Sequence, residues 1–287
     1  MVKNKQRGNR LGFIIFDIYL SIGVKHAYAL LYFVCIHYLL FDRTAVKSTA
    51  KYIKLRFPKC NFLKKYIHIY KIFINTGKNL VDLRLLEKKQ EQLQFQCNNQ
   101  PIIECLKNKN GLLMLSSHTG NWQIMMRKLP DFNVKKNIVM RLHNHPEIDE
   151  FFKLEKGELF NINIIDADKG LEASIEILQE LSNGNLVSIM ADRTISSSQN
   201  IQVDFFNKKI EIPKGPFLIA ASSKADIIQL IPFRINAASY KIKTYIISIP
   251  TGLNKKMKIN YIAQKYTDNI EKFLSEQPYE WNATSLL

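Results

Sequence analysis

From Gly111 onward the sequence alternates short apolar runs with longer amphipathic ones, and this alternation restricts the chain to few folds. The apolar runs have the length and composition of buried strands: "LLMLSS", "NIVMRL", "INIID" and "LVSIMAD". Between them, apolar residues recur at helical spacing. Strands that alternate with helices in this way form a parallel sheet with helices on its faces. We therefore expect an α/β fold with a mostly parallel central sheet covered by helices.

The remaining elements fit the same architecture. Residues 51–96 have helical periodicity, with a break at Pro58. Residues 146–160, 171–183, 215–224 and 260–277 also predict helices, whereas residues 227–236 and 240–249 predict strands. "IQVDFFN" and "KKIEIP" predict a hairpin. The chain contains no repeat and no linker-like stretch, which indicates one α/β domain preceded by a helical extension.

Positive charge is concentrated in the first third of the chain. Residues 1–89 carry 18 Lys and Arg against 4 Asp and Glu, a net charge of +14, out of +16 for all 287 residues. The remainder carries 23 against 21 and is nearly balanced. Nucleic-acid binding is a weak interpretation of this charge, because the cations lie beside apolar segments and no nucleic-acid module is recognisable in the α/β part.

The most apolar sequence lies in the same third, in "LGFIIFDIYLSIGV" and "HAYALLYFVCIHYLLF". The second run has 16 residues, short of the roughly 20 that span a bilayer. Basic residues on both sides favour a helical pair in the membrane interface, held by anionic head groups. A buried core helix with a solvated basic tail is the other interpretation. No cleavage site of a signal peptide follows the apolar run.

We therefore divide the chain at residue 45. Residues 1–45 form the membrane-associating segment, and residues 46–287 form the α/β domain with a helical lead-in over 46–110. The α/β domain is expected on the cytoplasmic side, where basic flanks accumulate. The four cysteines have no metal-type or disulfide-type pairing, so no metal is expected.

A candidate site follows the first strand of the α/β part. In such sheets, active groups gather at the carboxyl ends of strands, and His118 comes directly after "LLMLSS". A histidine there can take a proton from a hydroxyl if a second group fixes its tautomer. Gln123 lies five positions after His118, one turn into the expected helix, where a side chain can reach back to the imidazole. A purely structural histidine is the alternative.

Blocks of sequence along most of the chain resemble one family. "SSHTGNWQ" is similar to the His-x4-acid motif of the lysophospholipid acyltransferase superfamily, in the form found in the bacterial lipid A biosynthesis acyltransferase family. Further blocks resemble that family in the same order: "KYIKLRFP", "VMRLHNHPEIDEF", "MADRT", "VDFFNKKIEIPKGPFLIA" and "YEWN". Ordered blocks over about 250 residues are more specific than any one motif.

The resemblance implies transfer of a fatty acyl group from a thioester, usually on acyl carrier protein, to a hydroxyl of a lipid A precursor or related glycolipid. It implies no cofactor, and it places the reaction at the cytoplasmic face of the inner membrane. His118 would be the general base. Backbone N–H groups near Asn121, or the Arg193 guanidinium, would stabilise the oxyanion.

The sequence departs from the family motif at Gln123, where an Asp or Glu is expected. An amide can accept a hydrogen bond from imidazole but cannot stabilise imidazolium by charge. Three outcomes follow: a slower enzyme, a substitute carboxylate, or a degenerate member that binds lipid or a carrier without chemistry. Asp192, at the end of "LVSIMAD", is the candidate substitute, and its alternative role is a salt bridge or helix cap.

Four other positions are candidates for substrate binding. Trp122 lies within the motif, and Arg193 could bind phosphate, although a surface arginine there would also be ordinary. Lys214 and Gly215 form a turn that could present backbone donors to an anion, or serve only to begin a helix. His143 and His145 are more simply surface histidines than metal ligands.

Overall fold

The computed structural model describes residues 10–88, 93–128, 132–141, 162–194, 199–237 and 239–281. The chain divides into two compact units. The first unit comprises Met1–Phe95 and Arg234–Lys241, and the second comprises Gln96–Phe233 and Ile242–Leu287. Each unit is described by itself.

Within the described residues, seven strands form one sheet in the order β1-β9-β8-β2-β5-β3-β4. The strands are β1 (Gln94–Gln96), β2 (Leu112–Ser116), β3 (Lys136–Met140), β4 (Ile162–Asp166), β5 (Leu186–Met190), β8 (Asp226–Asn236) and β9 (Ser239–Ile246). The pairs β2–β5, β2–β8, β3–β5 and β3–β4 are all parallel. The predicted α/β fold with a mostly parallel sheet is confirmed.

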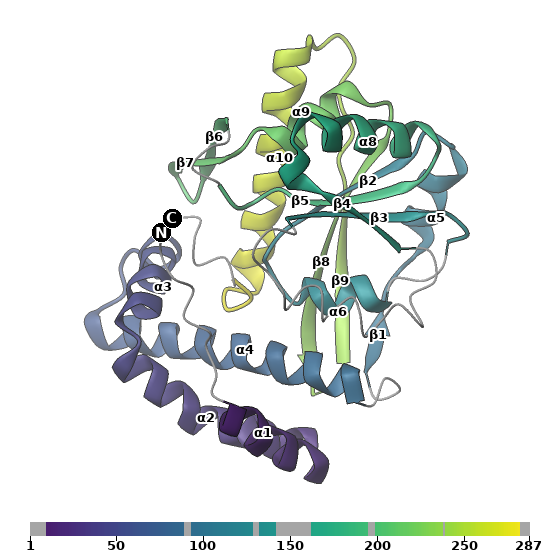
Figure 1. Ribbon diagram of the computed structural model, residues 1–287. Helices are drawn as coiled ribbons and strands as arrows, with labels where there is room; N and C mark the ends of the chain where they lie inside the picture. Colours follow the sequence, from purple (N-terminus) through teal and green to yellow (C-terminus); the bar gives the residue numbers. More distant parts are fainter. Residues whose placement is uncertain are drawn as a thin grey trace. The chain divides into compact units, whose positions relative to one another are not determined.

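Helices cover both faces of this sheet (Figure 1). Figure 1 shows α8 (Leu171–Ser182) and α9 (Gly215–Ser222) on one side and α6 (Trp122–Lys128) on the other. Because β2 is buried along its whole length, it needs apolar residues on both faces, which explains its uninterrupted run "LLML". On the α6 side, Leu112 and Met114 pack with Met125 of α6 and with Ile102 and Cys105 of α5 (Gln100–Lys107).

Most predicted elements of this unit are confirmed, with local differences. β6 (Asn200–Phe205) and β7 (Lys208–Pro213) form the predicted antiparallel hairpin. α10 (Lys255–Glu276) begins five residues before the predicted start, because the Asn254 side chain accepts a hydrogen bond from the Met257 N–H and caps the helix. The helical prediction for residues 51–96 is wrong at its end, where Gln94–Gln96 form the strand β1, and α5 was not predicted as a separate helix within the helical lead-in. The predicted helix over 146–160 lies outside the described residues.

The first unit contains four helices, α1 (Arg10–Ile22), α2 (Val24–Phe41), α3 (Arg43–Arg56) and α4 (Phe62–Lys88). The predicted break at Pro58 is confirmed, since it falls between α3 and α4. Among the described residues, α2 is the one helix long and apolar enough to cross a membrane, with a mean hydropathy of 1.4. Only 22% of α2 is buried. Its buried residues form a narrow stripe: Ala27, Tyr28, Leu31 and Cys35.

A buried ion pair lies inside this unit. Arg234 donates from Nε to the Asp82 carboxylate of α4 at 2.8 Å, and the two side chains are only 7% and 0% exposed. Tyr28 and Tyr240 also donate hydrogen bonds to Asp82. Burial alone would lower the pKa of the Arg234 guanidinium, but the Asp82 charge outweighs it and raises that pKa. Asp82 therefore gathers one cation and two hydroxyl groups in the interior.

Asp82→Asn keeps the shape of this side chain but leaves the buried guanidinium of Arg234 without a counter-charge. We expect it to lower the free energy of unfolding by about 3–5 kcal/mol, the cost of removing one partner of a buried pair. Chemical denaturation followed by circular dichroism measures this loss. The matched control is Asp17→Asn, which breaks the exposed pair with Arg84 and should cost less than about 1 kcal/mol. Equal losses in the two variants would contradict the expectation.

Candidate active site

The sheet register brings His118 and Asp192 together. Parallel pairing of β2 with β5 sets Ser116 opposite Met190. His118 and Asp192 each lie two residues beyond these partners, at the carboxyl ends of adjacent strands. The two side chains therefore leave the sheet at the same level, although 74 positions separate them in the sequence. This edge of a parallel sheet is where ligands commonly bind.

Both carboxylate oxygens of Asp192 bond to His118. The imidazole Nδ1 lies 2.8 Å from Oδ1, and the backbone N–H of His118 donates to Oδ2 at 2.6 Å. The Asp192 side chain is 2% exposed and that of His118 is 18% exposed. An ionised carboxylate only accepts hydrogen bonds, so the arrangement favours the tautomer with the proton on Nδ1. Nε2 then carries the lone pair and is free to act as a base.

The segment after His118 is pinned by backbone contacts from two other parts of the second unit. The Gly120 N–H donates to the Glu280 carbonyl at 2.8 Å, and the Asn121 N–H donates to the Pro232 carbonyl at 3.2 Å. Thr119 also forms a β-bridge with Trp281. β8 and the C-terminal segment therefore hold the loop between β2 and α6 and set the position of His118.

The backbone at position 120 lies so close to the Pro232 carbonyl that only glycine fits there. It has φ +71°, and a Cβ atom built there would lie 1.7 Å from the Pro232 carbonyl oxygen. No side chain fits in that space unless the backbone moves. The glycine of "HTGNW" is therefore a packing requirement of the loop that carries His118.

Tyr266 of α10 ties together the ends of the two strands that precede His118 and Asp192. Its hydroxyl donates to the Ser116 carbonyl at 2.8 Å, and the Ala191 N–H donates to the same carbonyl at 3.0 Å. Burial, and then the nearby charge of Asp192, raise the pKa of Tyr266 well above its usual value. The phenol therefore stays protonated at neutral pH and keeps its role as a donor.

The other sequence-predicted residues occupy different positions around this pair. Gln123 is half-buried on α6, and no hydrogen bond joins it to the His118 ring within the part of the chain that the structure describes. The ring of Trp122 meets His118 edge-on, with centroids 6.5 Å apart. Asn121 is buried, and its backbone N–H is already bonded to Pro232. Arg193, next to Asp192, is exposed.

Lys214 and Gly215 lie at the beginning of α9. The Lys214 N–H donates to the Gln199 carbonyl at 2.9 Å, so this donor is already used within the protein. Among the described residues, no hydrogen bond or ion pair connects Lys214 or Gly215 to His118 or Asp192. His143 and His145 lie outside the described residues, and no cluster of potential metal ligands occurs within them.

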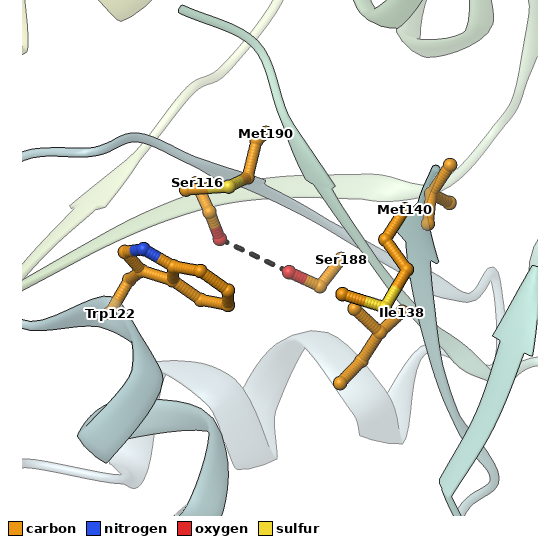
Figure 2. A pocket seen from close by; sticks show the side chains of 7 residues that line it. Ser116, Trp122, Ile138, Met140, Ser188 and Met190 are labelled. Carbon is orange, nitrogen blue, oxygen red and sulfur yellow. Dashed lines mark hydrogen bonds between the residues drawn. The ribbon is translucent and has the colours of Figure 1, made fainter. Parts of the chain in front are cut away.

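A small cavity lies beside the site on the α6 side of the sheet, with a volume of about 30 Å³. Figure 2 shows Trp122 and Met140 reaching toward it from opposite sides, with Ser116 and Ser188 joined by a hydrogen bond between them. By size it holds about two or three water-sized groups. Its walls are almost entirely apolar. The lining residues are Ser116, Trp122, Ile138, Val139, Met140, Ser188 and Met190.

Sequence reasoning missed the residues that hold the site in place. Tyr266, Pro232 and Glu280 lie far from His118 in the sequence and carry no catalytic signature. Tyr266 reads as a core residue, because it follows Ile262 and precedes Ile270 on the buried face of α10. The block "YEWN" was the one signal for the C-terminal anchor, and it gave no role for Glu280 or Trp281.

The arrangement can perform general-base chemistry. It contains a partly exposed histidine that a buried carboxylate orients through Nδ1. Within the described residues, no Ser, Thr or Cys side chain is hydrogen-bonded to the His118 ring, which is the arrangement that an activated protein nucleophile requires. The site therefore suits activation of a hydroxyl on a bound substrate.

Gly120→Ala should disturb this site beyond the ordinary strain of a positive φ. Alanine in the left-handed region costs roughly 1–2 kcal/mol by itself, and here its Cβ also collides with a backbone carbonyl. Gly252→Ala is the matched control, because Gly252 has φ +84° and open space around its Cβ position. We expect a clearly larger loss of unfolding free energy for Gly120→Ala. The NMR chemical shifts of the His118 ring should also change in that variant alone, and identical behaviour of both variants would refute the packing role.

Comparison with known proteins gives one family. The sequence model described as bacterial lipid A biosynthesis acyltransferase matches residues 8–283. No curated protein gives a significant match. The matched range includes His118, Asp192, Tyr266 and the C-terminal anchor at Glu280 and Trp281.

Proposed function

Because the chain belongs to the bacterial lipid A biosynthesis acyltransferase family, we propose that it transfers a fatty acyl group from a thioester to a hydroxyl of a lipid A precursor or related glycolipid, with His118 as the general base. The observation that carries this proposal is the hydrogen-bonded pair of His118 and Asp192 at the carboxyl end of the sheet. Family membership supports acyl transfer in general. The pair supplies the base that such a reaction needs.

The chemistry follows from the orientation of the imidazole. Nε2 of His118 removes the proton from the acceptor hydroxyl as its oxygen attacks the thioester carbonyl. Asp192, bonded to Nδ1, stabilises the imidazolium that forms. When the tetrahedral intermediate collapses, the carbon–sulfur bond breaks and the imidazolium returns its proton to the departing thiolate. An ester and a free thiol result, and no acyl-enzyme forms.

The developing oxyanion needs a donor in place before the reaction. The two predicted donors are the backbone N–H groups near Asn121 and the Arg193 guanidinium. The Asn121 N–H is bonded to Pro232, and Arg193 is an exposed cation that follows Asp192 in the sequence. We assign the role to Arg193. A guanidinium also suits a phosphate group on the acceptor or on the donor's prosthetic arm.

The contact of Asp192 with His118 supports one of the three outcomes that Gln123 left open. In the family motif the acid five positions after the histidine orients the imidazole, but here the nitrogen that it would orient is already bonded to a buried carboxylate. We propose that Asp192 replaces that acid, so that the enzyme remains active with an amide at position 123. Gln123, which is half-buried in the first turn of α6, would then contact the substrate.

The acyl donor we propose is acyl carrier protein, and the cavity between Trp122 and Met140 would receive part of the acyl chain. Its apolar walls suit hydrocarbon and exclude polar groups. Members of this family are associated with bacterial membranes, and the largely unburied apolar helix α2 is the segment suited to that environment. We propose that the reaction takes place at the cytoplasmic face of the inner membrane.

His118→Ala and Asp192→Asn test the base and its partner. We expect His118→Ala to abolish acyl transfer, and Asp192→Asn to lower kcat by about 10³–10⁴, as in a triad whose aspartate loses its charge. The assay measures thiol release from acyl carrier protein thioesters with a bacterial lipid extract, together with the newly acylated lipid. Asp268→Asn, an exposed carboxylate on α10, is the control and should keep wild-type activity. Full activity of His118→Ala would overturn the assignment.

Gln123→Glu separates a working enzyme from a degenerate binding protein. Because Nδ1 of His118 already has a carboxylate partner, restoring the family acid should change kcat by less than about tenfold. A gain of several orders of magnitude would mean that Asp192 does not replace the acid. If both forms bind the acyl carrier but neither transfers an acyl group, a binding role replaces the enzymatic one.

A further inference from the structure

The segment from α3 to the middle of α4 has a one-sided charge composition. Residues 43–81 contain ten Lys and Arg and no Asp or Glu. Within α3 itself every charged side chain is therefore a cation, and Asp42, which precedes the helix, caps its first turn. All of these cations except Arg43 lie beyond residue 45, the predicted end of the membrane-associating segment.

The cations of α3 form a stripe on one face of the helix. Arg43, Lys47, Lys51 and Lys54 are all exposed, at spacings of three and four residues, which places them on the same side. The opposite face packs inward with Ala45, Thr49, Tyr52 and Ile53. Folding of the first unit therefore turns these four cations outward together. We call these four residues the α3 stripe.

Large apolar side chains are exposed at both ends of the α3 stripe. Phe41, at the end of α2, is 71% exposed and is separated from α3 only by Asp42. Phe62 and Leu63, in the first turn of α4, are 69% and 72% exposed. Lys65 also lies over the rings of Phe62 and Tyr66. Exposed apolar groups interleaved with cations are typical of a helix that lies in a membrane interface, where apolar groups enter the acyl boundary and cations remain at the phosphates.

We propose that the α3 stripe, with Phe41 of α2 and the first turn of α4, forms a second membrane contact that binds the phosphates of anionic lipids. It differs from the contact made by α2 in that its cations lie on the exposed face of α3 and not at the flanks of an apolar helix. It extends the membrane surface over α3 and α4, and it holds whether or not the protein transfers acyl groups. An acidic protein would also meet the cations, but it would not need Phe41, Phe62 and Leu63 uncovered.

The test compares vesicles of phosphatidylcholine with vesicles that also contain phosphatidylglycerol, using the full-length protein. The stripe variant replaces Arg43, Lys47, Lys51 and Lys54 with Gln. The matched control replaces Lys208, Lys209, Lys255 and Lys256 with Gln, which removes the same charge from exposed positions in the second unit. Circular dichroism checks that both variants fold, and vesicle flotation gives the bound fraction.

We expect the wild type and the control to bind anionic vesicles more tightly than neutral ones, and salt to weaken this preference. The stripe variant should lose up to about 600-fold in affinity for anionic vesicles, since each of the four cations contributes about fivefold near an anionic surface. Its binding to neutral vesicles should remain.

Equal binding of the stripe variant and the wild type to anionic vesicles would overturn the proposal. So would an equal loss in the control, because net charge rather than the α3 stripe would then be responsible. If vesicle binding is unchanged but the KM for acyl carrier protein rises, the stripe docks an acidic protein and not a membrane. Phe62→Ser with Leu63→Ser should weaken binding to both kinds of vesicle, and unchanged binding would exclude the apolar part of the contact.

Discussion

The candidate site depends on the parallel register between β2 and β5. Because Ser116 lies opposite Met190, the residues two positions beyond each strand meet, and these residues are His118 and Asp192. A shift of one residue would turn every side chain of one strand to the other face of the sheet. Tyr266 bonds to the last carbonyl of β2 and thereby fixes the strand ends. The contact between His118 and Asp192 therefore depends on the pairing of the strands and on α10, which lies near the end of the chain.

Because the site depends on strand pairing, the sequence could reveal only its local part. The local motif identified His118 and pointed to Gln123 as its partner, because residues five positions apart are visible together in a sequence. Asp192 could be named only as a candidate, since the spatial order of the strands is not written in their composition. Tyr266 and Pro232 were beyond reach for the same reason. Both look like ordinary core residues, and their role appears only when α10 and β8 are placed against the loop at Gly120.

The fold itself was easier to predict, because burial leaves a strong pattern. Strands such as β2 and β5 are covered on both faces and must be continuously apolar, and their sequences show it. β1, by contrast, is three residues long and reads "QFQ". It lies at the edge of the sheet, where one side of the strand has no partner and polar residues are accommodated. α5 has only eight residues, too few for its periodicity to stand out.

The distribution of acidic side chains gives the first unit its external charge. Residues 10–85 contain three carboxylates, and each is engaged within the protein. Asp17 pairs with Arg84, Asp42 caps α3, and Asp82 is buried with Arg234. Cations therefore outnumber carboxylates on this segment, ten to none over residues 43–81. Like charges on one helix face repel one another, and an anionic surface relieves that repulsion while it gains contacts. Because the few carboxylates of this segment bond within the protein, the α3 stripe remains strongly cationic and suits a surface of anionic lipid.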